Sequence, residues 1–327
     1  MKYIIFGGSG FIGTHLIHLI KETNPQSTIY CFDIVMPGEE GVVPGIVEKN
    51  DGVIYKRVDV REKIDIKLDI TGEDIVFNLA AVHRTPGHKP IEYFETNIRG
   101  AENVTEWAMQ NNVKRMLFTS SIAPYGASED QKNETTLPTP NTPYGISKLV
   151  AEKIHQCWAD KNGTQLIIAR PGIVYGKGEH GNMTRLYSGI KNHYFFYTRK
   201  DTIKACIYVK ELVNFFIWAL ENRMNGIWNC TFEPAYNIEQ ICESMKKATG
   251  INTFIPSING KILTAIASVV GTLGGKAVGI HPARVKKLMV STNINGEKLK
   301  NCGYIWKYSL EESFKDWFAD CNRDSLK

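Results

Sequence analysis

The sequence predicts an α/β protein built on a doubly wound parallel sheet, followed by a smaller and mostly helical C-terminal lobe. Two observations predict this fold class. Short apolar runs alternate with longer helix-like segments over the first part of the chain, and a glycine-rich turn joins the first run to the first helix. Such alternation is typical of a parallel sheet that helices cover on both faces.

The expected elements follow from this rhythm. Apolar runs predict strands over residues 2–7, 28–34, 52–60, 74–81, 115–121 and 165–176. Amphipathic segments predict helices over residues 14–22, 93–110 and 144–160. Together they predict a nucleotide-binding domain over residues 1–175, because strands that alternate with helices form βαβ units.

The regular alternation of strand-like and helix-like segments ends after about residue 176. Helix-like stretches at 210–222 and 238–250 lack the earlier rhythm, which predicts a smaller substrate-binding lobe over residues 176–327. Apolar segments near 203–215 and 226–232 are expected to return to the sheet. Ligands of open parallel sheets bind at the carboxyl ends of the strands, so a site between the two parts is expected.

Composition excludes several classes of protein. The net charge of +5 over 327 residues is mild and scattered, which argues against a nucleic-acid partner. The seven cysteines are odd in number and lack metal-ligand spacing, which favours reduced thiols, a cytoplasmic location and no metal. Residues 262–280 form a largely apolar stretch, but it contains Lys276, four glycines and several hydroxyl side chains, which argue against a membrane span. The stretch would suit a hydrophobic substrate or a membrane surface.

The glycine-rich turn reads GGSGFIG and spans residues 7–13, directly after the first strand. Its glycines allow a tight turn and a close approach of the backbone to a pyrophosphate, which the amino end of the following helix would bind. For the same reason we interpret the apolar N-terminal segment as a strand and helix rather than a signal peptide. The turn predicts a Rossmann-type, dinucleotide-binding domain.

Asp33 ends the second strand, where a carboxylate accepts hydrogen bonds from a ribose and repels a 2′-phosphate, so NAD is favoured over NADP.

A tyrosine and a lysine lie four positions apart in PYGISK, at Tyr144 and Lys148, and therefore share a helix face. A nearby ammonium and a positive nicotinamide ring would favour the phenolate of Tyr144, which could then take a proton from a substrate hydroxyl. Ser121, at the end of the fifth strand, could stabilise charge on the same oxygen. We expect these three residues to be catalytic.

These motifs together resemble the extended short-chain dehydrogenase/reductase family, in its branch of NAD-dependent sugar-nucleotide epimerases and dehydratases. The resemblance implies a retained NAD, whose contacts would be Gly7, Gly10, Phe11, Ile12, Gly13, Asp33, Asp59, Val60, Leu79, Ala80, Ala81, Asn97, Thr119, Tyr144, Lys148, Pro171 and Ile173. It also implies substrate contacts from Ser121, Asn182, Lys204 and Arg284. The residues alone leave Asp33 and Asp59 open to roles as turn residues, and Asn97 open to a role in satisfying local backbone.

The chain departs from the pattern of dehydratases in that family. Ile122 and Ala123 stand where those enzymes have acids, and neither can transfer a proton, so a dehydratase is disfavoured. Lys204 and Ala205 stand where many members have arginine and aspartate, and a lysine lacks the bidentate fork of an arginine. His281 and Arg284 could compensate for that loss.

The expected function is a sugar-nucleotide epimerase that transiently oxidises a ring hydroxyl of a UDP-, GDP- or dTDP-linked sugar, with a homodimer as the expected assembly. A keto-sugar reductase and a carboxyl-lyase remain open because the same residues serve both. A hydroxysteroid- or flavonol-type dehydrogenase also remains open, as does a regulatory protein without catalysis.

Overall fold

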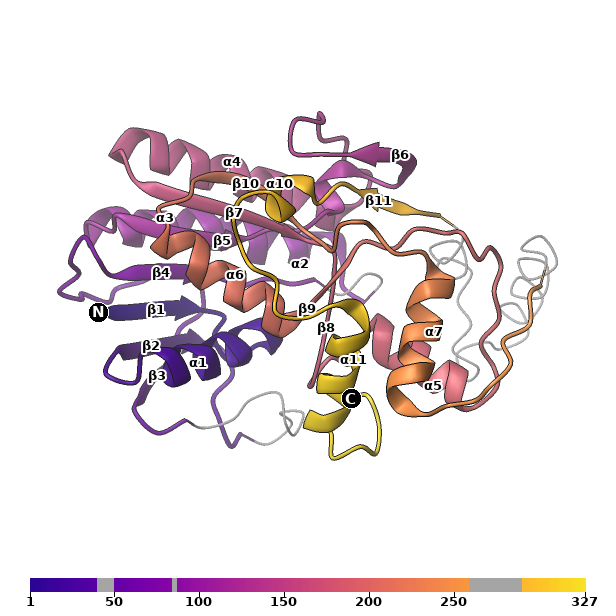
Figure 1. Ribbon diagram of the computed structural model, residues 1–327. Helices are drawn as coiled ribbons and strands as arrows, with labels where there is room; N and C mark the ends of the chain where they lie inside the picture. Colours follow the sequence, from indigo (N-terminus) through magenta and orange to yellow (C-terminus); the bar gives the residue numbers. More distant parts are fainter. Residues whose placement is uncertain (40–49, 84–86, 259–289) are drawn as a thin grey trace.

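The computed structural model describes residues 1–39, 50–83, 87–258 and 290–327. Its centre is a parallel sheet of seven strands in the order β10-β7-β5-β4-β1-β2-β3 (Figure 1). The strands are β1 Lys2–Phe6, β2 Thr28–Asp33, β3 Val53–Arg57, β4 Ile75–Asn78, β5 Arg115–Thr119, β7 Gln165–Pro171 and β10 Gly226–Cys230. The doubly wound, Rossmann-like fold class is confirmed.

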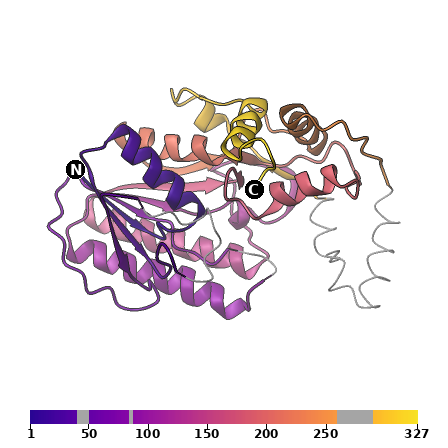
Figure 2. The same ribbon diagram turned by 90° about the horizontal axis from the view of Figure 1, so that it is seen from below.

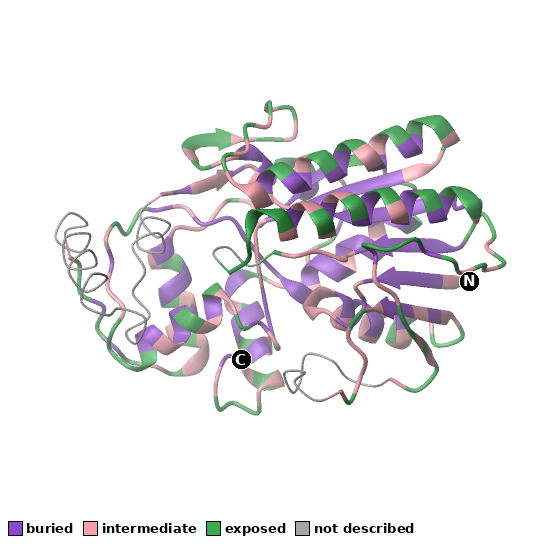
Figure 3. Ribbon diagram, turned by 180° about the vertical axis from the view of Figure 1, so that it is seen from behind, coloured by how far each residue is buried: buried purple, intermediate pink, exposed green. Residues whose placement is uncertain are grey.

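Two helical layers cover this sheet. The helices α1 Phe11–Thr23 and α6 Val209–Glu221 lie on one face, and α3 Arg99–Gln110 and α4 Pro143–Asn162 lie on the other (Figure 2). The central strands are buried on both sides, whereas α3 and α4 expose their outer faces (Figure 3). This is why the strands read as continuous apolar runs and the helices as amphipathic ones.

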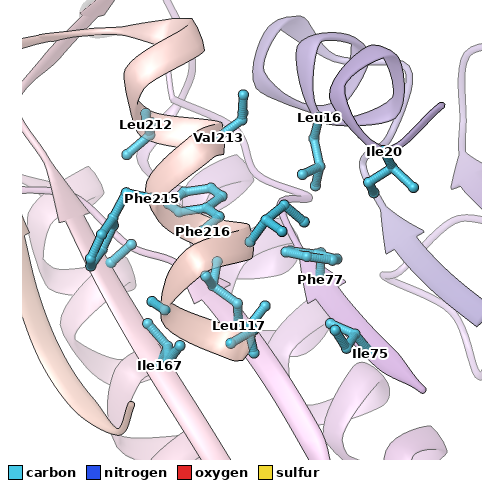
Figure 4. Close-up of a cluster of buried hydrophobic side chains, with 14 of the residues drawn as sticks. Leu16, Ile20, Ile75, Phe77, Leu117, Ile167, Leu212, Val213, Phe215 and Phe216 are labelled. Carbon is cyan, nitrogen blue, oxygen red and sulfur yellow. The ribbon is translucent and has the colours of Figure 1, made fainter. Parts of the chain in front are cut away.

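The core between α1, α6 and the sheet is built from branched and aromatic side chains. Leu16 and Ile20 from α1 point toward Phe77 of β4 and Phe216 of α6, and all four are buried (Figure 4). Burying side chains of this size stabilises the fold by about 1.5–3 kcal/mol each. Helix α6 therefore belongs to the layer on the sheet, although the sequence places it among the segments that lack the strand–helix rhythm.

The smaller group of helices lies beyond the carboxyl ends of the strands (Figure 1). It contains α5 Asn182–Lys191, α7 Ile238–Thr249 and α11 Leu310–Asp320, which share one apolar cluster. Short strands β8 Ile173–Tyr175 and β9 Cys206–Tyr208 pair with each other, and β6 Ser128–Lys132 pairs with β11 Thr292–Ile294. A short helix, α10 Glu297–Lys300, and a 3₁₀ turn at Ala123–Tyr125 are also present.

One expected strand is divided in the structure, and one returning segment adds no strand to the main sheet. The strand expected over 165–176 divides at Gly172 into β7, in the main sheet, and β8, which pairs with β9. The backbone of Ala205 passes so close that a Cβ on Gly172 would lie 2.5 Å from its carbonyl oxygen. The segment near 203–215 consequently returns as β9 and α6 without adding a strand to the main sheet, whereas the 226–232 segment does supply β10.

The helix expected over 93–110 is also less regular than its pattern. It consists of a short helix α2 Pro90–Tyr93, a π-helical stretch Phe94–Ile98 and then α3. The π-helical stretch contains Asn97, whose side chain is buried and fully used in hydrogen bonds. Such widened turns are frequent at functional sites.

Candidate active site

The glycine loop lies at the carboxyl end of β1, against the end of β4. Gly7 has a φ of +77°, and a Cβ there would lie 2.6 Å from the backbone nitrogen of Ala80. A Cβ on Gly13 would lie 2.6 Å from the Cα of Gly8. Side chains are therefore excluded from both positions by backbone, and the loop closes tightly under the first turn of α1.

The amino end of α1 is open to an anion. Gly10 caps the helix without any side-chain hydrogen bond, and the first turn contains no acidic residue. The amide groups of Phe11, Ile12 and Gly13 stand in that first turn, where helix N–H groups have no intrahelical partner. These features fit the pyrophosphate of a dinucleotide.

Asp33 connects the end of β2 to this loop. One carboxylate oxygen accepts a hydrogen bond from the amide of Ser9 at 3.0 Å, and the other accepts one from the amide of Val35 at 3.2 Å. Burial raises the pKa of Asp33, while these amides oppose the shift. The carboxylate thus lies beside the phosphate cradle, where a ribose of NAD would meet it.

The two residues expected at the adenine have other contacts. The Asp59 carboxylate accepts hydrogen bonds from the Arg61 guanidinium, with Nε 2.9 Å from one oxygen, and this contact lowers the pKa of Asp59. Val60 is buried against Gly100, and its carbonyl accepts a hydrogen bond from Asn103. Their predicted role at the cofactor remains a prediction, with Asp59 acting as a turn residue in this structure.

The catalytic candidates meet at the end of β5. The Ser121 hydroxyl lies close enough to the Tyr144 phenol to lower its pKa, and its oxygen accepts a hydrogen bond from the amide of Ala123 at 3.1 Å. Removal of the Tyr144 phenol from water raises its pKa to about 12, and Ser121 opposes this rise. The structure thus brings together the serine and tyrosine that the sequence singles out.

Lys148 is buried one turn further along α4. Its Nζ donates a hydrogen bond to the carbonyl oxygen of Thr119 at 2.7 Å and lies 4.6 Å from the centre of the Phe118 ring. Burial lowers the pKa of Lys148 to about 7, and the Glu152 carboxylate opposes the shift. Burial is the largest influence on the Tyr144 phenol in the protein alone. The expectation that Lys148 and the nicotinamide ring together favour the phenolate remains a prediction.

Asn97 joins three elements around the site. Its amide nitrogen donates to the Ser147 hydroxyl at 2.9 Å and to the Val82 carbonyl at 3.1 Å, and its oxygen accepts from the Val82 amide. The side chain therefore fixes helix α4 against the segment after β4, which contains Leu79, Ala80 and Ala81. This geometry fits support of the site rather than chemistry.

The neighbouring strand ends complete one edge of the sheet. The Thr119 hydroxyl is buried and has no hydrogen-bond partner within the described residues, as expected for a group that faces a ligand. The Pro171 carbonyl accepts a hydrogen bond from the amide of Ile122, and the Ile173 amide donates to Ala205. The open helix end, the glycine cradle and this unpaired hydroxyl all fit NAD.

The predicted substrate contacts are less well defined. Asn182 is exposed at the start of α5, and its side chain accepts a hydrogen bond from Arg185. Lys204 is buried and donates to the Val290 carbonyl at 2.6 Å, and burial lowers its pKa to about 8. Arg284 lies outside the described residues, as do His281 and the apolar stretch 262–280. Within the described ranges, no helix is both long enough and apolar enough to cross a bilayer.

Sequence reasoning missed the buried polar residues behind the catalytic pair. Ser120, Glu152 and Arg170 are all buried, and the Glu152 carboxylate accepts hydrogen bonds from both of the others. Glu152 lies four positions after Lys148, on the same helix face, and this spacing could have indicated it.

Fold and site together fit an enzyme that binds a dinucleotide beside a buried tyrosine and lysine. A family model described as the NAD dependent epimerase/dehydratase family matches residues 3–231. The chain belongs to this family and is an NAD-dependent enzyme of the epimerase type, as the sequence motifs predict.

The similarity to individual relatives extends over most of the chain. An N-acetyl-alpha-D-glucosaminyl-diphospho-ditrans,octacis-undecaprenol 4-epimerase of Escherichia coli O157:H7 is 27% identical over 325 residues, covering 94% of this chain and 92% of the relative. A UDP-glucose 4-epimerase of Lactobacillus helveticus is 28% identical, covering 77% of this chain and 83% of the relative.

Solved structures agree with the fold. A UDP-glucuronic acid 4-epimerase from Bacillus cereus in complex with NAD has a TM-score of 0.74 at 19% identity, with 100% of both chains covered. A UDP-glucose 4-epimerase from Thermus thermophilus in complex with NAD has a TM-score of 0.71 at 19% identity, with 99% of both chains covered.

Proposed function

We propose that this chain is a 4-epimerase of sugars linked to a diphosphate carrier, with a sugar nucleotide as the first substrate class. The observation that supports it most strongly is the position of Tyr144 close to Ser121 at the carboxyl edge of the sheet, beside a glycine loop that fits a dinucleotide. The relatives described above are 4-epimerases, which favours C4 as the reacting carbon. The reductase, lyase, steroid and regulatory alternatives gain no comparable support.

In this proposal the chain's own residues handle the proton and the developing charge. Tyr144 is the general base that accepts the proton of the C4 hydroxyl, and Ser121 donates a hydrogen bond to the same substrate oxygen. Lys148 supplies a buried positive charge near the end of β5, where it favours negative charge on oxygen. NAD, when bound, supplies a hydride acceptor and, once reduced, a hydride donor.

The return step uses the same residues in reverse. The keto sugar presents its opposite face, and Tyr144 gives its proton back to the oxygen as the C4 hydrogen is restored. Neither Ile122 nor Ala123 has a group that could remove water from the intermediate, so the sugar leaves as an epimer. Because the reaction has no net redox change, a single retained cofactor suffices.

A second carrier is favoured by a specific observation. The relative from Escherichia coli O157:H7 is aligned over 92% of its length and is named for a polyprenyl diphosphate sugar. Residues 262–280 of this chain have an apolar sequence, which suits a hydrophobic carrier. A polyprenyl diphosphate that carries an N-acetylhexosamine is therefore the second candidate substrate, ahead of GDP- or dTDP-linked sugars.

One experiment separates these candidates. Purified protein is incubated with UDP-glucose, UDP-N-acetylglucosamine, UDP-glucuronic acid and, in detergent, polyprenyl-diphospho-N-acetylglucosamine, and the sugars are separated after release. Conversion of a UDP-sugar supports the first class, and conversion of the lipid-linked sugar alone supports the second. If all four are recovered without their C4 epimers, the proposed function is wrong.

We also propose a homodimer in the cytoplasm. Ile91 on α2 and Ile146 and Val150 on α4 are exposed apolar side chains, which would suit an interface formed by these helices. All seven cysteines are free, which supports a reducing compartment. Sedimentation of the purified chain tests the assembly, and a monomer at micromolar concentration would contradict it.

A further inference from the structure

Three buried polar residues lie directly behind the catalytic pair. Glu152 is wholly buried on α4, and its carboxylate accepts hydrogen bonds from Arg170 Nε at 2.8 Å and from the second guanidinium nitrogen at 2.6 Å. The same carboxylate accepts a bond of 2.5 Å from the Ser120 hydroxyl. One carboxylate thus ties α4 to the ends of both β5 and β7.

The position of Ser120 gives this network its significance. It stands between Thr119, whose carbonyl accepts a hydrogen bond from the Lys148 ammonium, and Ser121, whose hydroxyl lies close to the Tyr144 phenol. Any movement of Ser120 would therefore move both contacts of the catalytic pair. Bidentate arginine–carboxylate pairs impose geometry as well as energy, so this anchor is rigid.

The charges around Lys148 are few within the described part of the chain. Glu152, His155 and Tyr144 face it or flank it on α4, Arg170 approaches Glu152 from β7, and Tyr93 of α2 packs against Tyr144. His155 stacks on the face of Phe118, and burial lowers its pKa to about 4, so it is neutral at physiological pH. Glu152 is then the group that offsets the loss of water around the lysine.

We propose that Glu152 is a positioning residue for catalysis: one helix turn after Lys148, its carboxylate fixes the strand end that orients Lys148 and Tyr144 and attracts the buried Lys148 ammonium. Arg170 holds the carboxylate in place, and Ser120 transmits its position to β5. The role in catalysis rests on the proposed function, whereas the electrostatic coupling of Glu152 to Lys148 does not.

The pH dependence of the attraction between Glu152 and Lys148 follows from the protonation of the lysine. Burial lowers the pKa of Lys148 from 10.5 to about 7, so the folded protein loses this proton at a lower pH than the unfolded chain. The attraction to Glu152 exists only while Lys148 is charged, at pH values below about 7, and it vanishes as the pH rises above that value. Removing the carboxylate moves the loss of the proton to still lower pH.

The direct test is a double-mutant cycle on the full-length chain at matched NAD occupancy. Glu152→Gln, Lys148→Met and the double variant are unfolded in urea at about pH 5.5 and about pH 9. We expect about tenfold coupling between the two changes in the unfolding equilibrium constant at the lower pH, the equivalent of about one pKa unit, and none at the higher pH. Coupling that is equal at both pH values, or absent at both, overturns the proposal.

Ser120→Ala is the matched control, because it removes one hydrogen bond of Glu152 and no charge. Its coupling to Lys148→Met is expected to be the same at both pH values. If the Glu152→Gln variant does not fold, the cycle is run in an Arg170→Gln background, where the substitution leaves no unpaired guanidinium, and the same pH-dependent coupling is required there.

Activity provides the second readout. In the Glu152→Gln variant the alkaline limb of the kcat profile should move to lower pH by about one unit, whereas Ser120→Ala should lower kcat without moving it. An unmoved limb in Glu152→Gln with intact pH-dependent coupling would reject the catalytic role alone. Because the unfolding cycle needs no turnover, failure of the proposed function cannot be mistaken for failure of the coupling.

Discussion

At the scale of single residues, Tyr144 is the proposed base, and neighbouring groups determine how readily its phenol loses a proton. The Tyr144 phenol has a pKa raised to about 12, so its protein environment by itself keeps the proton on the oxygen. Ser121 opposes this rise in the pKa of Tyr144. The charge of Lys148, buried one turn away, is proposed to favour the phenolate together with the positive nicotinamide ring. The pairing of Tyr144 with Lys148 could be predicted from the spacing of PYGISK, and Ser121 from its place at the end of the fifth strand. The direction of the shift in the pKa of Tyr144 could not, because burial is a property of the folded chain.

Replacement of Tyr144 by phenylalanine removes only the hydroxyl that moves the proton. We expect kcat to fall by at least about 10²-fold, the usual effect of losing a positioned acid or base, with little change in cofactor content. Turnover is measured by epimer formation, and bound NAD is measured after denaturation. Near-normal turnover in this variant would remove Tyr144 from the mechanism.

Asp33 is expected to set the choice of cofactor. An asparagine there keeps the size and an oxygen for the Ser9 amide but removes the charge that repels a 2′-phosphate. We expect the preference for NAD over NADP to fall by about tenfold, or about 1.4 kcal/mol. Titration calorimetry on nucleotide-free protein measures both dissociation constants, and an unchanged ratio would assign Asp33 to the turn alone.

At the scale of elements, regular patterns were predictable and close approaches were not. The strands of the sheet and helices α1 and α4 could be predicted from apolar runs and amphipathic spacing, because local burial determines both. The break at Gly172 could not, because it depends on Ala205, which is distant in sequence. Likewise β6, with the polar sequence SEDQK, forms only because β11 pairs with it.

The glycine loop offers a prediction at this scale. In Gly13→Ala the new Cβ would lie 2.6 Å from the Gly8 backbone, so the loop must shift. We expect a loss of about 1–3 kcal/mol in the free energy of unfolding, as for other overpacked sites, together with weaker NAD binding. Urea unfolding and the Tm gain on adding NAD measure the two effects.

Gly72→Ala is the matched control for that change. A Cβ at Gly72 would meet nothing within 4 Å, and the residue has no positive φ. The free energy of unfolding should stay within about 0.5 kcal/mol of that of the unchanged protein. Equal losses in the two variants would mean that the tightness of the loop has no special role.

At the scale of the whole molecule, topology turns distant segments into one site. The strand order places the ends of β1, β2, β4, β5 and β7 along one edge, and these ends lead into Gly7, Asp33, Leu79, Ser121 and Pro171. This convergence is predictable in kind, since such sheets bind ligands at their carboxyl edge. The hydrogen-bond partners of Lys204 and Asn182 were not predictable, because the sequence of the smaller lobe has no regular pattern. The domain boundary near residue 175 stays a prediction.

The most direct test of the central claim follows the hydrogen on C4. A substrate that the chain epimerises is prepared with deuterium at C4 and converted in ordinary water, and the product is examined by mass spectrometry. Transient oxidation at C4 predicts that the epimer keeps its deuterium, because the same hydrogen leaves and returns within the site. Replacement of the deuterium by hydrogen from water would contradict the account.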